Sequence, residues 1–151
     1  MSGKTYTIDQ FRNALLALDD KIRGGVIAKA AMAGGYVIET YAKINAEKTF
    51  KSGTGNLMSS INTTLEKSDS TSAEVAVGPT VIYGRIQELG GVIKPVTAKR
   101  LHWVDEGGKH HTALSVTLPP RPYLRPAVDD HEPQIIKAVS ENLRIEIEGA
   151  I

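Results

Sequence analysis

The sequence contains no cysteine, and this absence excludes a disulfide scaffold, thiolate metal sites and cysteine nucleophiles. It has no apolar run long enough to span a membrane, and its first residues lack the apolar core of a secretory signal. The net charge of +1 gives no overall electrostatic case for binding nucleic acid or a membrane surface. We therefore expect a soluble protein made inside the cell, with no membrane partner and no specific nucleic-acid partner.

What the chain does contain is an ordinary globular balance of 41% hydrophobic and 23% charged residues over 151 positions. A chain of this length buries about two-thirds of its unfolded surface, so we expect a single domain over residues 1–151, with 1–7 disordered. Its charges are unevenly placed. Residues 94–125 carry six Lys/Arg against two Asp/Glu, and residues 129–148 carry six Asp/Glu against two Lys/Arg. Either these are two solvated faces, or a basic edge of one subunit meets an acidic edge of the next.

Helical periodicity marks the first third of the chain. Thr7–Gln10 is a capping-box pattern that opens a first helix, and the pair Gly24-Gly25 can end or kink it. A second run over residues 25–48 is interpreted as one long helix. Its middle, residues 28–35, consists mainly of alanine and glycine, which suits close approach by a neighbouring backbone.

Alternation replaces helical spacing from Ile61 onward. Residues 61–77 predict a β-hairpin closed by Gly78-Pro79, and a short helix follows over Val81–Leu89. Residues 94–118 predict a second, projecting hairpin, and an amphipathic helix capped by Asp130 ends the chain. The expected fold class is α+β: an antiparallel β-sheet of two hairpins packed against long N-terminal helices and a C-terminal helix.

The stretch Leu118–Val128 holds four of the seven prolines. Because each proline removes a backbone donor and restricts the residue before it, this stretch is predicted to be a stiff extended connector between sheet and helix. Tyr123 and Leu124 have nothing local to pack on, so we expect them to anchor the connector to a core.

Candidate catalytic and metal-binding residues are few. His110-His111 and the acidic run Asp129–Glu132 could contribute to a metal site, but adjacent histidines on a strand point to opposite faces. No serine lies in a nucleophile elbow. Trp103 could stack on a base, although a lone strand tryptophan is more often a core or interface residue. We expect neither an enzyme nor a cofactor, and no metal site.

Two segments, taken together, resemble one protein family. Residues 83–90, Tyr-Gly-Arg-Ile-Gln-Glu-Leu-Gly, are similar to the Tyr-Ala-Arg-Phe-Val-Glu-Phe-Gly element of tailed-bacteriophage tail-completion, or head–tail joining, proteins. Residues 118–127 resemble the Pro-Pro-Arg-Pro-Phe-Leu-Arg-Pro-Ala corner of that family. A Thr-Gly-x-Leu-x-x-Ser-Ile entry at Thr54–Ile61 supports the match, which extends from Ile8 to Ile147. The departures, such as Gly84 in place of alanine, lighten the packing but keep the polarity pattern.

The resemblance implies a structural role. Proteins of this family form rings, commonly six-fold, in the virion neck or tail terminus, after assembly in the host cytoplasm. Their partners are copies of themselves, portal, adaptor or head-closure proteins, and the tail tube protein. By matching position, the resemblance implies polar contacts at Arg85, Glu88, Arg121 and Arg125. It implies buried anchors at Tyr83, Tyr123 and Leu124. The alternatives are a non-enzymatic binding module of the same fold and a small metal-dependent hydrolase or nuclease.

Two further expectations concern contacts of single side chains. Trp103 is predicted to be largely buried at the root of the second hairpin, within the monomer or against a neighbour. Arg121 and Arg125 are predicted to grip carboxylates, either Glu88 or the run Asp129–Glu132, within the chain or between subunits.

Overall fold

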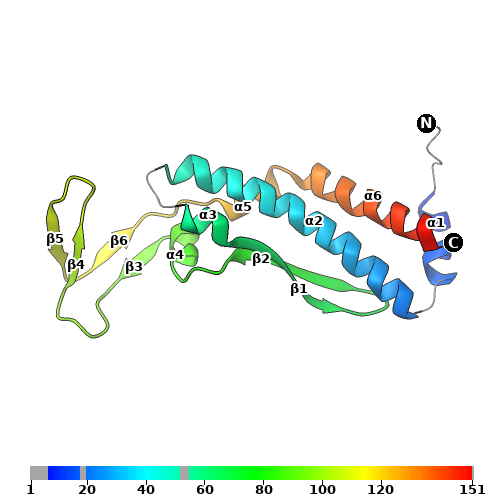
Figure 1. The fold of residues 1–151 in the computed structure, drawn as a ribbon, viewed down its shortest axis with the longest axis horizontal. Helices are drawn as coiled ribbons and strands as arrows, with labels where there is room; N and C mark the ends of the chain where they lie inside the picture. Colours follow the sequence, from blue (N-terminus) through cyan, green and yellow to red (C-terminus); the bar gives the residue numbers. More distant parts are fainter. Residues whose placement is uncertain (1–6, 18–19, 52–54, 151) are drawn as a thin grey trace.

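The computed structural model describes residues 7–17, 20–51 and 55–150 (Figure 1). Apart from Thr7, the residues expected to be disordered at the N-terminus lie outside these ranges, as does Thr54 of the family-like entry. The fold is α+β, as predicted. The elements in order are α1 (Ile8–Ala17), α2 (Asp20–Thr49), α3 (Asn56–Ser60), β1 (Ile61–Ser68), β2 (Ala73–Pro79), α4 (Gly84–Leu89), β3 (Gly91–Ile93), β4 (Leu101–Val104), β5 (His110–Ala113), β6 (Val116–Leu118), α5 (Leu124–Asp129) and α6 (Glu132–Ala150).

The first helix begins as its sequence predicts. The Thr7 hydroxyl accepts a hydrogen bond from the Gln10 backbone N–H at 3.3 Å, and the Gln10 side chain accepts one from the Thr7 N–H at 2.8 Å. However, α1 ends at Ala17, and Gly24-Gly25 lie inside α2 rather than ending the first helix. Gly24 permits a close approach there, because a Cβ on it would lie 3.1 Å from the Asp69 carbonyl oxygen.

The long helix α2 lies between two layers, with α6 on one side and the β1–β2 hairpin on the other (Figure 1). Its two central glycines face these two layers. A Cβ on Gly34 would lie 2.8 Å from Val139 of α6, and a Cβ on Gly35 would lie 2.5 Å from the Thr63 methyl group of β1. The predicted close approach at the alanine- and glycine-rich middle of α2 is therefore confirmed.

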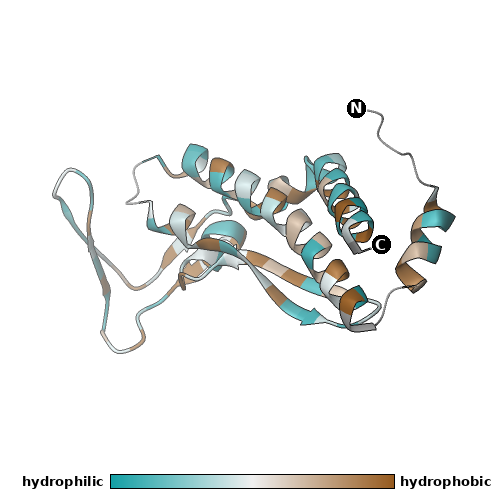
Figure 2. Cartoon of the chain, turned by 45° about the vertical axis from the view of Figure 1, so that its right-hand side comes forward, coloured by the Kyte–Doolittle hydropathy of each residue, from teal (hydrophilic) through white to brown (hydrophobic). Residues whose placement is uncertain are grey.

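The hydrophobic core gathers at the C-terminal half of α2, where α3, β1 and α5 meet it. Its largest fully buried side chains are Tyr123 and Ile61. The remaining members are small or short: Ala42, Ala46, Leu57 and Ala127. In Figure 2 the hydrophobic stretches lie mainly on the helices and on the β1–β2 hairpin, whereas the segment from β3 to β6 is mostly hydrophilic or intermediate.

Residues 91–118, from β3 to β6, project away from the helices, and we refer to them as the arm (Figure 1). Within the arm, β3 pairs with β6 and β4 pairs with β5, each in antiparallel register. The projecting hairpin is thus present, but the strands of the described chain form three separate two-stranded ladders instead of one continuous sheet. The hairpin that packs on α2 is β1–β2, which carries a bulge between Leu65 and Lys67.

The proline-rich stretch is only partly extended, so the prediction for Leu118–Val128 is wrong in its second half. Helix α5 begins at Leu124, with Pro126 as its third residue. A proline is tolerated there because the first-turn N–H groups of a helix have no intrahelical partner. Asp130 ends α5 instead of capping α6, which begins at Glu132 with Pro133 in its first turn.

Candidate functional site

The two family-like segments meet at the carboxylate of Glu88. This side chain extends from α4 and accepts three backbone N–H groups at the start of α5. Its Oε2 accepts from Tyr123 at 2.7 Å and from Leu124 at 2.9 Å, and its Oε1 accepts from Arg125 at 3.0 Å. These N–H groups belong to a helix start and have no intrahelical acceptor. Glu88 therefore caps α5 from a position far away in the sequence.

Tyr123 anchors the same junction from inside the core. Its side chain is fully buried, its hydroxyl donates to the Gly84 carbonyl at 3.1 Å, and its ring packs edge-on against Phe50. The Asn45 side chain donates to the Tyr123 carbonyl at 3.2 Å. Burial of the phenol, helped by the nearby charge of Glu88, raises the pKa of Tyr123 to about 12. Tyr123 is therefore a structural residue that stays protonated at any physiological pH.

Two glycines let the segments approach this closely. A Cβ on Gly84 would collide with the Pro79 ring and lie 3.2 Å from the Tyr123 hydroxyl. Gly90 has φ 69°, and a Cβ there would lie 2.7 Å from the Pro120 nitrogen. The two segments are joined further by a hydrogen bond from the Arg121 N–H to the Gln87 carbonyl at 2.8 Å. We name residues 84–90 together with 118–125 the corner clasp.

The buried anchors implied by the resemblance are only partly observed. Tyr123 is fully buried, as predicted, and Leu124 is half-buried. Tyr83 is 44% exposed, so the prediction that it is a buried anchor is wrong. It precedes α4 and, with Phe50, lines an open pocket of about 450 Å³ beside the core.

The arginine side chains do not make the predicted pair with Glu88, because backbone N–H groups occupy that carboxylate. The Arg125 Nε lies 4.0 Å from the Asp129 carboxylate, and both side chains are mostly exposed. A pair of this exposure contributes little stability. Arg121 and Arg85 are also exposed. The arginines thus remain at the surface. Within the chain, the predicted grip on Glu88 is wrong, whereas Arg125 lies near Asp129 of the alternative run Asp129–Glu132. Contacts of these arginines between subunits stay a prediction.

Trp103 lies on β4, within the arm. Its ring stacks on His111 of β5 at a centroid distance of 5.2 Å, yet the residue remains 40% exposed. Burial within the monomer is therefore contradicted, because the described contacts of β4 are chiefly with β5; burial against a neighbour stays a prediction. The His111 Nε2 lies 2.8 Å from the Asp105 carboxylate. This contact, with the N–H groups of Lys109 and Gly107, holds the pKa of Asp105 below its ordinary value.

The other histidines of the arm lie on its opposite face. His110 and His102 contact each other, with Nδ1 and Nε2 3.1 Å apart, while His111 faces Trp103. Adjacent histidines thus point to opposite faces, as predicted from strand geometry. Within the described residues, no group of three or more His, Cys, Asp or Glu side chains could hold a metal ion.

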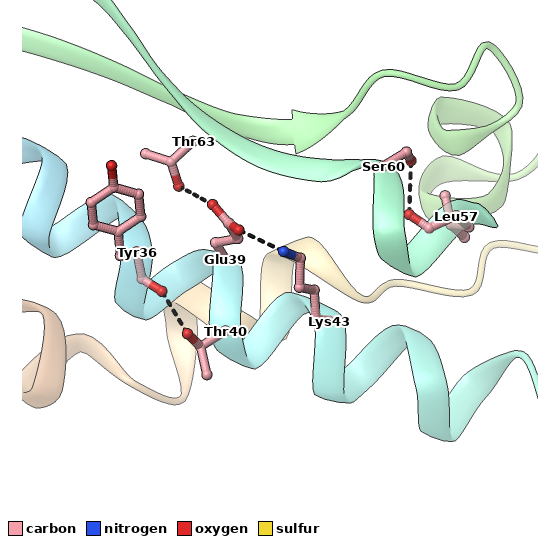
Figure 3. A network of polar contacts seen from close by, with 7 residues as sticks. All are labelled: Tyr36, Glu39, Thr40, Lys43, Leu57, Ser60 and Thr63. Atoms are coloured by element: carbon pink, nitrogen blue, oxygen red, sulfur yellow. Dashed lines mark hydrogen bonds and ion pairs between the residues drawn. The ribbon is translucent and has the colours of Figure 1, made fainter. Parts of the chain in front are cut away.

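A further polar contact, which sequence reasoning missed, fastens β1 to α2 (Figure 3). The Glu39 carboxylate accepts hydrogen bonds from the Lys43 ammonium at 2.6 Å and from the Thr63 hydroxyl at 2.7 Å. Partial burial acts to raise the pKa of Glu39, but these two hydrogen bonds outweigh it and hold that pKa below its ordinary value. The Glu39–Lys43 spacing was visible in the sequence; the Thr63 partner was not.

Asp69 organises the turn between β1 and β2. Its carboxylate accepts hydrogen bonds from the N–H and hydroxyl groups of both Thr71 and Ser72, at 2.7–2.9 Å. These hydrogen bonds hold the pKa of Asp69 well below its ordinary value. Beside this turn, the Ser68 hydroxyl donates to the Gly24 carbonyl at 3.2 Å, so the turn is fastened to α2.

Because the folded-state pKa of Asp69 is depressed, its contribution to stability is fully present above the unfolded pKa, about 4, and is lost progressively as the pH falls from there through the folded-state pKa. We expect Asp69→Asn to melt a few degrees below the parent protein at pH 7, with the difference narrowing progressively as the pH falls below about 4 toward the depressed folded-state pKa. Thermal melts between pH 7 and pH 2.5 measure this effect. Glu106→Gln, which changes an exposed carboxylate in the arm, serves as the control. A constant offset at all pH values would contradict the prediction.

Comparison with protein-family models, with curated proteins and with solved structures finds no match for this chain. Within the described ranges, none of the helices combines the length and the apolar character that crossing a bilayer requires.

Proposed function

We propose that this protein is a structural subunit of a tailed-phage virion. It forms a ring at the neck or tail terminus, where the ring completes the tail and joins it to the head. Its partners in this role are copies of itself, a portal, adaptor or head-closure protein, and the tail tube protein. It acts through contacts and not through catalysis.

The observation that carries this proposal is the corner clasp. The two segments that resemble the tail-completion family are separated along the chain, yet Glu88 of the first binds the backbone of Tyr123, Leu124 and Arg125 in the second. If the resemblance has a physical basis, the residues of the two motifs should contact each other in the fold. Here the glutamate of one motif and the aromatic residue of the other stabilise the same corner.

The arm gives a second line of support. It projects from the helices (Figure 1), and it lies mostly within the basic stretch 94–125, whereas residues 129–148 are acidic. Two surfaces of opposite charge on one chain favour head-to-tail contacts between copies. Such contacts close into a ring when the rotation per subunit divides a full turn evenly.

The proposal predicts that purified protein, concentrated to the millimolar range, forms closed rings with a single copy number. Native mass spectrometry measures the copy number, and negative-stain microscopy shows whether the particles are annular. A monomer or dimer that persists across the whole concentration range would count against a ring and in favour of a simple binding module.

A further inference from the structure

A groove lies at one end of the molecule, between the first turns of α2 and the last turns of α6. Its volume is about 470 Å³. It is lined by the apolar side chains of Ile22, Val26 and Ile145, by Gly25 and Gly149, and by the ion pair between Lys29 and Glu146. Ile22 is 51% exposed and Ile145 is 58% exposed. A Cβ on either glycine would meet nothing within 4 Å, so the groove is open. It could accept one large apolar side chain.

The arm offers such a side chain at the other end of the molecule. Trp103, the only tryptophan in the sequence, is 40% exposed, and the neighbouring Val104 is 50% exposed. Both belong to the two-stranded β4–β5 ladder, which pairs with no other strand of the described residues. An isolated two-stranded hairpin is marginally stable in water. Contact with another surface would therefore order the arm and remove its apolar side chains from water.

Two exposed glutamates of α6 near the groove, Glu141 and Glu148, complement the basic residues of the arm. Glu146 is already paired with Lys29 at 2.7 Å. Glu141 and Glu148 lie two turns apart on the same side of α6 and flank Ile145. Glu141 has only an exposed contact of 3.9 Å with Lys137. The arm carries four basic residues against two acidic ones, namely Lys94, Lys99, Arg100 and Lys109 against Asp105 and Glu106.

The positions of the two surfaces require that they belong to different copies. In Figure 1 the arm and the groove-forming ends of α2 and α6 lie at opposite ends of the long axis. An arm therefore cannot reach the groove of its own chain. Building on the ring proposed above, we propose that Trp103 of one copy inserts into the α2–α6 groove of the next, with the basic arm residues facing Glu141 and Glu148.

Tryptophan fluorescence reports on this contact directly, because all of the tryptophan emission comes from Trp103. We expect the emission maximum to shift to the blue as rings assemble. Trp103→Ala should leave the fold of the monomer intact and abolish the rings. Tyr36→Ala, which removes another exposed aromatic ring from the middle of α2, is the matched control and should still assemble.

Charge reversal tests the pairing itself. Lys99→Glu with Arg100→Glu reverses the arm, and Glu141→Lys with Glu148→Lys reverses the groove rim; these residues are exposed, so each variant should fold. Either reversal alone should raise the concentration for half-assembly by roughly tenfold or more. Both reversals in one chain should restore assembly, because each interface regains opposite charges.

Lys67→Glu with Glu74→Lys exchanges an exposed ion pair on the β1–β2 hairpin at unchanged net charge, and controls for charge substitutions made away from the proposed interface. It should assemble like the parent protein. Rings that form with an unshifted Trp103 emission, or that tolerate both single-sided reversals, would overturn this interface while leaving the ring function standing. If the parent protein forms no ring at all, the proposed function fails, and this interface fails with it.

Discussion

Replacing Glu88 by alanine is expected to lower the free energy of unfolding by roughly 2–4 kcal/mol. For a chain of this size, that loss lowers the melting temperature by roughly 5–15 °C. The substitution removes the acceptor of the N–H groups of Tyr123, Leu124 and Arg125. Leaving a half-buried N–H group without an acceptor lowers the free energy of unfolding by more than one ordinary hydrogen bond contributes. Thermal and chemical denaturation of the monomer measure the effect.

Glu88→Gln separates the charge from the geometry. An amide keeps one carbonyl oxygen, which can still accept from Tyr123 and Leu124, but its NH₂ group faces the Arg125 N–H as a second donor. We therefore expect an intermediate loss of stability. Arg85→Ala, at an exposed position on the same short helix, is the control and should change the melting temperature little. If Glu88→Ala melts like Arg85→Ala, the clasp does not stabilise the fold.

The contrast between Glu88 and the arginines shows where sequence reasoning ends. The motifs indicated that Glu88 and the proline-rich segment belong together, and the contact is observed. The partners of the Glu88 carboxylate could not be predicted. Every non-proline residue carries a backbone N–H, so the sequence does not single out three of them, whereas Arg121 and Arg125 are obvious candidates for an ion pair. The same limit applies to α5: the prolines suggested an extended chain, but Pro126 occupies a first-turn position where it does not disturb a helix.

Local patterns were more informative where one interaction decides the structure. The capping box at Thr7 and the alternation in β1 and β2 depend on neighbours in the sequence, and both are observed. Trp103 depends instead on what lies across the arm, which residue spacing does not reveal. Its 40% exposure is a property of the single chain. Whether a second copy covers Trp103 is the question that the fluorescence experiment answers.

The alanine- and glycine-rich middle of α2 is a third kind of pattern, because the low helix propensity of its two glycines argues against the helix that forms. Each central glycine costs the helix about 1 kcal/mol relative to alanine. The cost is offset by packing: Gly34 admits α6 and Gly35 admits β1 and β2 at distances that no side chain allows. The three layers of the fold therefore depend on two glycines that themselves lower the stability of α2.

Substitutions of Gly35 test this argument, because packing and helix propensity predict opposite signs for the change in the free energy of unfolding. A Cβ on Gly35 would lie 2.5 Å from the Thr63 methyl group and 2.9 Å from a Val75 methyl group, both on stiff β-branched side chains. Overpacking of this kind costs typically 1–3 kcal/mol, against a helix-propensity gain of about 1 kcal/mol. We expect Gly35→Ala to lower the free energy of unfolding, and Gly35→Val to lower it by about 3 kcal/mol or more.

Gly25 lies on the same helix, and a Cβ there would meet nothing within 4 Å. Gly25→Ala should therefore raise the free energy of unfolding by about 0.5–1 kcal/mol, through propensity alone. Urea denaturation of the two alanine variants, made in parallel, isolates packing from propensity, because the chemical change and the helix are identical. If both variants are stabilised, the β1–β2 hairpin can move away from α2 at little cost, and the close approach at Gly35 does not hold the layers together.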